Sequence, residues 1–406
     1  MSNSVPEGWN IYSLDELGQV VGGGTPESNN TDYWGGDIYW ATPKEITKLS
    51  SRYINKTERT ITQDGLDRSS AKLHPIGTIL LTSRASVGYP AINTIPMATN
   101  QGFQSLRPNN KLDTEYGYQC LLNSRNKLEK LSAGSTFLEI SSKEVKKFKV
   151  VIPPLPEQKK IAAILTSVDT VIEKTQAQIN KLKDLKTSMM QELLTKGIGH
   201  TEFKDSPVGR IPVEWEVKII GSLGSVITGS TPKTSNADNY NGSIPFISPA
   251  DICTGQSMHI EVTKSTISEE GLTNTRELPA NSICVVCIGS TIGKAAITIS
   301  RCATNQQINS IVCKNSYPEY VYYLMMYYAK SIKSEASTQA VPIINKSAFS
   351  ALLVQVPPLS EQIKIGKIIK TIDDSLMTKQ DKLSSLRNIK KALMQDLLTG
   401  KVRVKV

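Results

Sequence analysis

A glycine-rich loop in the second half of the chain has part of a pattern that binds nucleotide phosphates. Residues 289–295 read Gly-Ser-Thr-Ile-Gly-Lys-Ala, and a phosphate-binding loop places backbone N–H groups and a lysine around such an anion. The loop is one residue short of that motif, and Ala295 stands where a Ser or Thr would hold magnesium. We therefore expect no nucleotide hydrolysis here, whereas an enzyme that used this loop would lose ATP binding in Lys294→Ala.

Cysteines near this loop have a spacing that zinc sites also use. They are Cys284, Cys287, Cys302 and Cys313. A matching stretch in the first half of the chain, described below, has Leu80, Ser83 and Met97 at three of the aligned positions and so lacks the ligands. Because cysteine in an apolar strand behaves as a small hydrophobic residue, we expect these thiols to pack in the core and to bind no metal.

Other reactive motifs are not found in the sequence. A DNA-amine methyltransferase needs a glycine-rich cofactor turn and an Asn/Asp-Pro-Pro-aromatic loop, but the proline pairs here precede leucine. The histidines are scattered, at His74, His200 and His259, and give no support for a Cys/His or Ser/His pair. We expect a chain that is not an enzyme and holds no cofactor of its own.

Composition and charge favour a polyanionic partner. The chain has 406 residues, a net charge of +10 and a pI near 9.1, with 39% hydrophobic and 21% charged residues. These are values of a globular protein of about two domains, and its excess of Lys and Arg suits phosphate-rich ligands. The start lacks a basic segment followed by an apolar run, and no stretch has the roughly 18 apolar residues of a membrane span. We expect a cytoplasmic protein that does not enter a membrane.

The segments that must position any functional site occur twice along the chain, as an internal repeat. Residues 6–9 correspond to 212–215, residues 23–26 to 229–232, residues 98–101 to 303–306, and residues 153–158 to 357–362. The spacing between copies stays between 204 and 206 residues, far longer than the repeat of a solenoid. The chain is therefore a duplicated module, and we expect its two copies to have a pseudo-twofold arrangement.

Each module consists of a mixed α+β domain and a long helix. Short β-rich runs alternate with Gly, Pro and Asn turns over roughly 150 residues, and a Pro-Pro pair then opens an apolar stripe without proline over about 40 residues. At about 1.5 Å per residue these helices are near 60 Å long. They either pack on their own domains independently or pair with each other as an antiparallel coiled coil. We favour the pairing, which places the domains at opposite ends.

Several segments resemble the specificity subunits of type I restriction-modification systems. Residues 203–215, which lead into the second domain, are similar to that family, as are the helix openings Pro-Pro-Leu-Pro-Glu-Gln and Pro-Pro-Leu-Ser-Glu-Gln. The helix ends at residues 191–197 and 395–401 and the Gly-(Ser/Gly)-Thr-Pro turns fit it as well. The resemblance covers essentially the whole chain, in order, in both copies.

The resemblance implies a subunit that reads a bipartite, asymmetric sequence in double-stranded DNA. We expect target-recognition domains at residues 1–153 and 199–356 and conserved spacer helices at 154–198 and 357–406. It also implies two methyltransferase (modification) subunits and restriction subunits as partners, with adenine methylation by the former. S-adenosylmethionine, ATP and magnesium are then expected on those partners.

The duplication offers a filter for residues that touch DNA. Positions that both copies share suit folding or the DNA backbone, whereas matched polar positions that differ suit base reading. The candidates in the first domain are Thr25, Lys44, Arg84, Ser86, Asn100 and Gln101, and those in the second are Thr231, Lys233, Ser290, Lys294, Asn305, Gln306 and Gln307. Alternatively, the threonines only form turns, and the shared Asn and Gln residues satisfy buried backbone groups.

A second apolar row along each helix predicts a surface for partner proteins. Its residues are Leu165, Ile172, Ile179 and Leu193 in the first helix and Ile369, Leu376, Leu383 and Leu397 in the second. They widen the stripe beyond what one partner helix covers, so we expect them to dock the methyltransferase subunits. The rival hypothesis is a free-standing DNA-binding or architectural protein without a methyltransferase partner.

Overall fold

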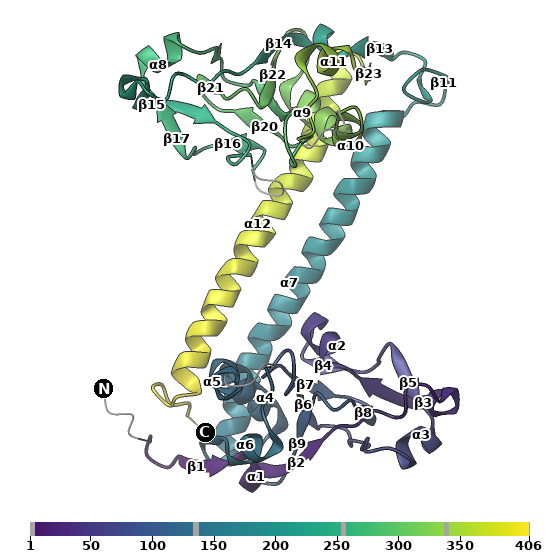
Figure 1. Cartoon of the computed structure of the whole chain (residues 1–406), viewed down its shortest axis with the longest axis vertical. Helices are drawn as coiled ribbons and strands as arrows, with labels where there is room; N and C mark the ends of the chain where they lie inside the picture. Colours follow the sequence, from purple (N-terminus) through teal and green to yellow (C-terminus); the bar gives the residue numbers. More distant parts are fainter. Residues whose placement is uncertain (1–4, 133–137, 253–256, 337–340, 406) are drawn as a thin grey trace. The chain divides into compact units, whose positions relative to one another are not determined.

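The computed structural model describes residues 5–132, 138–252, 257–336 and 341–405. It divides into two compact units, Met1–Ala177 with Lys382–Val406, and Gln178–Asp381. Each unit contains one mixed domain, part of the long helix that follows the first domain, and part of the helix that ends the chain (Figure 1). No helix among the described residues has the length and apolar character to cross a membrane.

The first domain is built on a five-stranded sheet in the order β2-β9-β6-β7-β4, with a three-stranded sheet β5-β3-β8 and a pair β1-β10. Its strands are β1 (Asn10–Ser13), β2 (Gly18–Gly22), β3 (Trp34–Ala41), β4 (Tyr53–Ile54), β5 (Arg59–Ile61), β6 (Ile79–Leu81), β7 (Pro90–Asn93), β8 (Met97–Thr99), β9 (Gln104–Pro108) and β10 (Lys149–Ile152). Its helices are α1 (Leu14–Leu17), α2 (Pro43–Lys48), α3 (Gln63–Asp67), α4 (Thr114–Asn123), α5 (Arg125–Leu131) and α6 (Ser142–Lys147). Every residue of β6, β7 and β8 is buried, which explains why these short strands are continuous apolar or small-residue runs.

The second domain repeats this plan. A five-stranded sheet runs in the order β14-β22-β19-β20-β16, beside a four-stranded sheet β17-β15-β21-β18 and a pair β13-β23. Its strands are β13 (Glu216–Ile219), β14 (Gly224–Thr228), β15 (Tyr240–Ile247), β16 (His259–Ile260), β17 (Ser265–Ile267), β18 (Glu277–Leu278), β19 (Ile283–Val286), β20 (Ala295–Thr298), β21 (Cys302–Thr304), β22 (Ile308–Cys313) and β23 (Leu353–Val356). Its helices are α8 (Glu269–Thr273), α9 (Pro318–Tyr327), α10 (Ala329–Ser334) and α11 (Lys346–Ala351), and a hairpin of β11 (Phe203–Lys204) and β12 (Ile211–Pro212) precedes it.

The long helices α7 (Leu155–Lys196) and α12 (Leu359–Leu397) begin directly after their proline pairs. The Gln of each opening motif ties the helix to its domain. Gln158 Nε2 donates to the carbonyl of Pro153 at 3.0 Å while its Oε1 accepts from the backbone of Asp113 at 2.9 Å. Gln362 makes the same two bonds, to Pro357 and from Tyr317. Because both glutamines are buried, these bonds fix where each helix leaves its domain.

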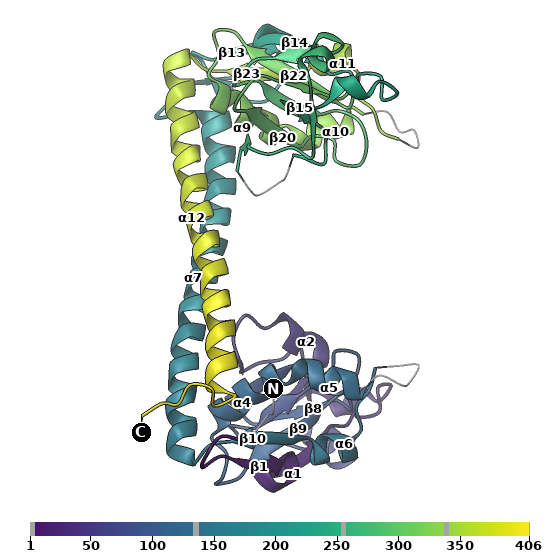
Figure 2. The same ribbon diagram turned by 90° about the vertical axis from the view of Figure 1, so that its left-hand side faces the viewer.

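Within each unit, segments of α7 and α12 run antiparallel (Figure 2). In the first unit Asp169 pairs with Lys390 at 2.6 Å, and Gln176, further along α7, accepts from Arg387, which comes earlier on α12. In the second unit Lys186 pairs with Asp373 at 2.6 Å. The expected fold class is confirmed: two homologous α+β domains, each followed by a long helix that takes part in antiparallel pairing.

The outward row predicted on the helices is wrong. Leu165 and Leu397 lie in the core of the first unit, Leu193 and Ile369 lie in the core of the second, and Ile179, Leu376 and Leu383 are also buried, while Ile172 is half-buried. The chain itself covers these side chains, so they are not free for a partner. The large apolar residues of α7 and α12 that do face solvent are Val171, Leu185, Leu359, Ile368, Met377 and Ile389, all exposed by 37 to 51%.

Candidate nucleic-acid interface

The glycine-rich loop at residues 287–294 does not form a phosphate-binding loop. It joins β19 to β20, which are antiparallel neighbours in one sheet, whereas a phosphate-binding loop leads from a strand into a helix. Gly289 adopts a φ of +97° and its N–H donates to the carbonyl of Pro342 at 2.9 Å. The loop is a hairpin connection, and the first domain has its counterpart between β6 and β7.

The cysteines of the second domain that the structure describes are free thiols, and Cys313 is half-buried. Cys284, Cys287 and Cys302 are buried, and burial raises the pKa of the Cys284 thiol to about 12 and that of Cys287 to about 11. Zinc and nucleophilic chemistry both need the thiolate, which burial disfavours. Among the described residues, no group of three or more Cys, His, Asp or Glu side chains is placed to hold a metal ion.

Three loops of the first domain meet at the turn between β8 and β9. The N–H of Ser83, in the loop after β6, donates to the carbonyl of Gly102 at 2.7 Å. The N–H of Gly24, in the turn after β2, donates to Thr99 at 2.9 Å. The β8–β9 turn also packs against the start of α2, where a Cβ added to Gly102 would lie 2.9 Å from Pro43 Cγ. Candidate residues 25, 44, 84, 100 and 101 therefore belong to one surface.

The second domain assembles the same loops around the turn between β21 and β22. The N–H of Cys287, at the start of the loop between β19 and β20, donates to the carbonyl of Gln307 at 2.8 Å. The N–H of Gly229, in the turn after β14, donates to the carbonyl of Ile308 at 3.0 Å. Asn305 N–H donates to Ile247, at the end of β15, at 3.0 Å. The duplicated sequence thus produces one such group of loops in each unit. We call each group a loop cluster; its tip is the turn at residues 100–103 in the first domain and at residues 305–307 in the second.

The turns separate the roles of the shared Asn and Gln residues. Asn100 Oδ1 accepts from the N–H of Gly102 at 2.9 Å, and Asn305 Oδ1 accepts from Gln307 at 3.1 Å. Each asparagine therefore shapes its turn. Gln101 and Gln306 are exposed at the tips and accept a hydrogen bond from Thr25 and Thr231, respectively.

Arg84 is exposed and already has an acidic partner. Its guanidinium donates to both carboxylate oxygens of Glu139 at 2.8 to 3.0 Å, and the two side chains are 47% and 41% exposed. A base or phosphate that contacts Arg84 must share it with Glu139 or displace that carboxylate. This contact joins residues 55 apart in sequence, and no motif in the chain indicated Glu139 as a member of the site.

The other candidates lie on the same loops. Lys44 is exposed near the start of α2, and Lys233 is exposed after the Thr231-Pro232 turn. Ser290 is exposed at the hairpin connection, while Lys294 and Ser86 are half-buried. Sequence reasoning also missed a cation–π contact next to β7, in which the Arg125 guanidinium lies 3.8 Å from the ring centroid of Tyr89.

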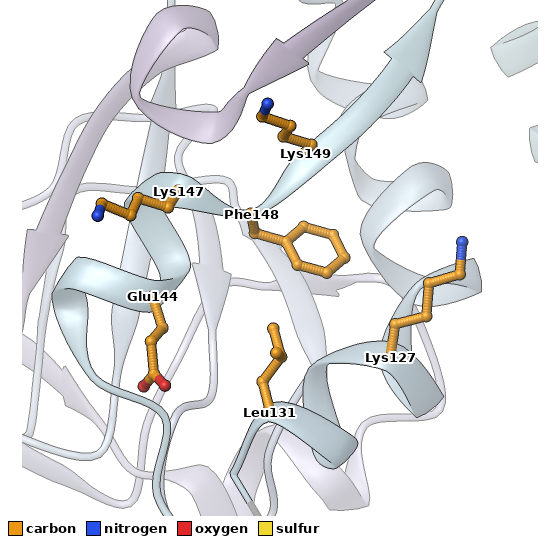
Figure 3. Close-up of a pocket in the computed structure, with 6 residues that line it drawn as sticks. All are labelled: Lys127, Leu131, Glu144, Lys147, Phe148 and Lys149. Atoms are coloured by element: carbon orange, nitrogen blue, oxygen red, sulfur yellow. The ribbon is translucent and has the colours of Figure 1, made fainter. Parts of the chain in front are cut away.

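A shallow pocket of about 430 Å³ lies on the first domain between α5, α6 and β10 (Figure 3). Its floor is Phe148 and Leu131, and Lys127, Lys147 and Lys149 surround it with their ammonium groups pointing away from the ring. The matched positions in the second domain are Ser331, Ala351 and Leu353. The three lysines around this pocket are therefore not shared by the two domains.

The family model described as the type I restriction modification DNA specificity domain matches residues 6–184 and 212–387. These two matches cover both modules. The chain belongs to this family. The resemblance found in the sequence is thereby confirmed, and the chain is a specificity subunit with two target-recognition domains.

Similar proteins support this assignment. The MjaIX type I restriction enzyme specificity subunit of Methanocaldococcus jannaschii is 28% identical, over 98% of this chain and 95% of its own length. The HindI specificity subunit of Haemophilus influenzae is 32% identical over 47% of this chain and 42% of its own. A solved S subunit from M. genitalium shares the fold, with a TM-score of 0.64 at 17% identity over 98% of each chain.

Proposed function

We propose that this specificity subunit recognises a two-part, asymmetric sequence in double-stranded DNA, one part by each loop cluster. The observation that carries the proposal is that both domains build the same cluster and fill it with different side chains. Lys44 is aligned with Ala250, and Gly102 is aligned with Gln307. Arg84 corresponds to Ile288, because each forms the equivalent β-bridge in its domain, to Glu139 and to Ile343. Clusters of one geometry with different donors and acceptors suit two half-sites of different sequence.

The exchange of one domain tests this proposal. Residues 1–153 are replaced by the first domain of another specificity subunit, and the methylated sequence is mapped in a host that carries the methyltransferase. We expect one half of the methylated sequence to change while the other half and the gap stay the same. A change in both halves would contradict a modular reader.

We further propose that the subunit is not itself catalytic and directs partner subunits. Two methyltransferase subunits, with S-adenosylmethionine, would methylate adenine, and restriction subunits would supply the steps that need ATP and magnesium. Support comes from the family membership and from the described residues, whose loop clusters are hydrogen-bonded turns with exposed polar tips.

The helix surface that remains for these partners includes a matched pair of residues. Leu185 on α7 and Ile389 on α12 occupy equivalent positions in the two modules and are 47% and 51% exposed. Exposed apolar side chains at the same place in each copy suit two copies of one partner.

Two substitutions and one control test the docking surface. We expect the co-expressed complex to lose one methyltransferase subunit when it carries Leu185→Glu, and likewise when it carries Ile389→Glu, because burial of a carboxylate in an interface is costly. Native mass spectrometry measures the number of subunits that remain bound. Lys370→Glu, at a position on α12 whose side chain is 36% exposed, keeps both. If no methyltransferase encoded beside this gene co-elutes with the unmodified chain, the subunit is instead a free-standing DNA-binding protein.

A further inference from the structure

A threonine and a glutamine are joined in the same way in both loop clusters. Thr25 Oγ1 donates to Oε1 of Gln101, and Thr231 Oγ1 donates to Oε1 of Gln306 at 2.6 Å. The partners lie 76 and 75 residues apart in sequence, so the folding of each domain brings them together. The bond connects the turn after the first strand of each five-stranded sheet with the exposed tip of the cluster.

Backbone contacts hold both partners of this bond. A Cβ added to Gly23 would lie 1.9 Å from the carbonyl oxygen of Asn100, and one added to Gly229 would lie 2.2 Å from that of Asn305. Only glycine permits this approach, which places the threonine two residues later beside the tip. The asparagine before each glutamine is also held in place. Its side-chain oxygen accepts a hydrogen bond from the backbone N–H two residues later in the chain.

The bond sets the direction of the glutamine amide. A carboxamide has an acceptor oxygen and a nitrogen with two N–H donors, and a hydroxyl donor on one side requires the oxygen there. Nε2 is then on the other side of the amide, at the end of an exposed side chain. The pair presents an oriented donor to any acceptor that approaches the cluster.

The duplication indicates what kind of acceptor this is. Around the pair, side chains differ between the copies, but Thr and Gln are the same in both. Identical groups in identical geometry do not distinguish two half-sites of different sequence. They suit a feature that both half-sites have, either a phosphate oxygen or a base-edge acceptor such as purine N7.

We propose that Thr25 and Thr231 are positioning residues that orient Gln101 and Gln306 as donors to an acceptor common to both half-sites. The inference rests on the proposed function, because it requires that the loop clusters bind duplex DNA. It adds to that function a division of labour in which this pair anchors each half-site and the differing residues read it.

The test uses the complex of the subunit with its methyltransferase and a duplex that contains the mapped target. Thr25→Val keeps the shape and removes the donor, Thr25→Ser keeps the donor, and Gln101→Ala removes the oriented amide. We expect Thr25→Val and Gln101→Ala to weaken binding by roughly 5-fold and 10-fold, as loss of one hydrogen bond does. The double variant binds no more weakly than Gln101→Ala, and Thr25→Ser binds as the unmodified complex does.

Two further readouts separate positioning from a merely structural role. The melting temperature of the DNA-free complex is the same for all four variants, because the threonine–glutamine bond is exposed. Additive losses in the double variant, or no loss in Thr25→Val while Gln101→Ala weakens binding, would overturn the inference.

Methylation mapping identifies the acceptor. If Gln101 contacts a phosphate, Gln101→Ala lowers methylation evenly and leaves the methylated sequence unchanged. If it contacts a base, Gln101→Ala relaxes the base preference at one position of one half-site. Gln306→Ala acts in the same way on the other half-site. Either result supports the inference, while an effect of both variants on the same half contradicts it. An unmodified complex that binds no duplex refutes the proposed function itself; normal binding that neither glutamine variant changes refutes the inference alone.

Discussion

At the scale of single residues, small side chains decide whether the loop clusters form. Gly23 and Gly229 allow the turn after the first sheet strand to touch the tip, and this contact depends on the absence of a Cβ. Gly22, one position earlier, has room, because a Cβ there would lie 3.5 Å from the side chain of Gln104. Neighbouring glycines in one turn therefore have different importance.

Gly23→Ala is expected to disrupt the first cluster. Overpacking against backbone atoms costs about 2 kcal/mol, and the displaced turn moves Thr25 away from Gln101. Denaturant unfolding and duplex binding measure the two effects. Gly22→Ala is the control, and equal losses in both variants would show that the close approach of Gly23 has no special role.

The buried cysteines give a second prediction at this scale. Because burial raises the pKa of Cys284 to about 12, its thiolate fraction at pH 8 is only about one in ten thousand, and an aromatic disulfide reagent should label it only after unfolding. The Cys284 thiol loses its proton at a higher pH in the folded protein than in the unfolded chain. Its contribution to the free energy of unfolding is therefore fully present below pH 9 and declines as pH rises toward 12. Rapid labelling of Cys284 in the native protein, or a lower melting temperature with a chelator, would contradict this structure.

Residue contacts were the part that the sequence could not predict. The candidates chosen from matched positions lie on loops that the fold brings together in each domain, and their contact with DNA stays a prediction. The matched positions could not pair Arg84 with Glu139 or Thr25 with Gln101, since those pairs depend on how loops 55 and 76 residues apart fold against each other.

At the scale of elements, a repeated polar contact ties the long helices to each other and to their domains. Asp169 accepts from Lys390 and from Gln119 of α4, both at 2.6 Å. Its counterpart Asp373 accepts from Lys186 at 2.6 Å and from the hydroxyl of Tyr323 on α9 at 2.8 Å. Each contact joins three elements of its own unit, and so helps to set the register of helix pairing there.

Lys390→Ala should therefore be more damaging than an ordinary surface substitution. It leaves the Asp169 carboxylate, whose side chain is 11% exposed, without its cation, which costs about 2 to 3 kcal/mol of unfolding free energy. The control is Lys370→Ala, since the Lys370–Asp374 pair is 36% and 58% exposed and contributes under about 0.5 kcal/mol. Urea unfolding compares them, and similar losses would mean that burial of the first pair is unimportant.

The sequence predicted the helices well and their faces poorly. Proline pairs mark the starts of α7 and α12, and unbroken apolar stripes predict their length. A wide stripe contains two rows, however, and spacing alone does not show which row the domain covers. Leu165 lies in the core of the first unit whereas Val171 is 41% exposed, because the domain packs over the start of the helix.

At the scale of the whole molecule, the proposed function makes the helices a spacer between half-sites. A seven-residue insertion into α7 between residues 170 and 185, matched by one in α12 between 374 and 389, keeps both aspartate–lysine pairs and the facing of the helices. The added length is about 10.5 Å. At about 3.4 Å per base pair, the gap in the methylated sequence should grow by about three base pairs.

Methylation mapping reads this result directly. Both half-sites should stay the same, since neither loop cluster is altered. An insertion in α7 alone is the control, because it breaks the matched register and should lower stability instead of giving a longer gap. An unchanged gap in the matched variant would mean that the helices do not set the spacing.

The last residues of the chain return to its beginning. Arg403 donates to the carbonyl of Glu7 at 2.8 Å and pairs with Glu157, so residues 7 and 403 lie together on the first domain. Because residues 7 and 403 are in contact, the fold does not dictate which of the two modules comes first in the chain. With the ends joined by a short linker and a new opening at residues 205–210, between β11 and β12, the second module would come first and every contact described above would persist.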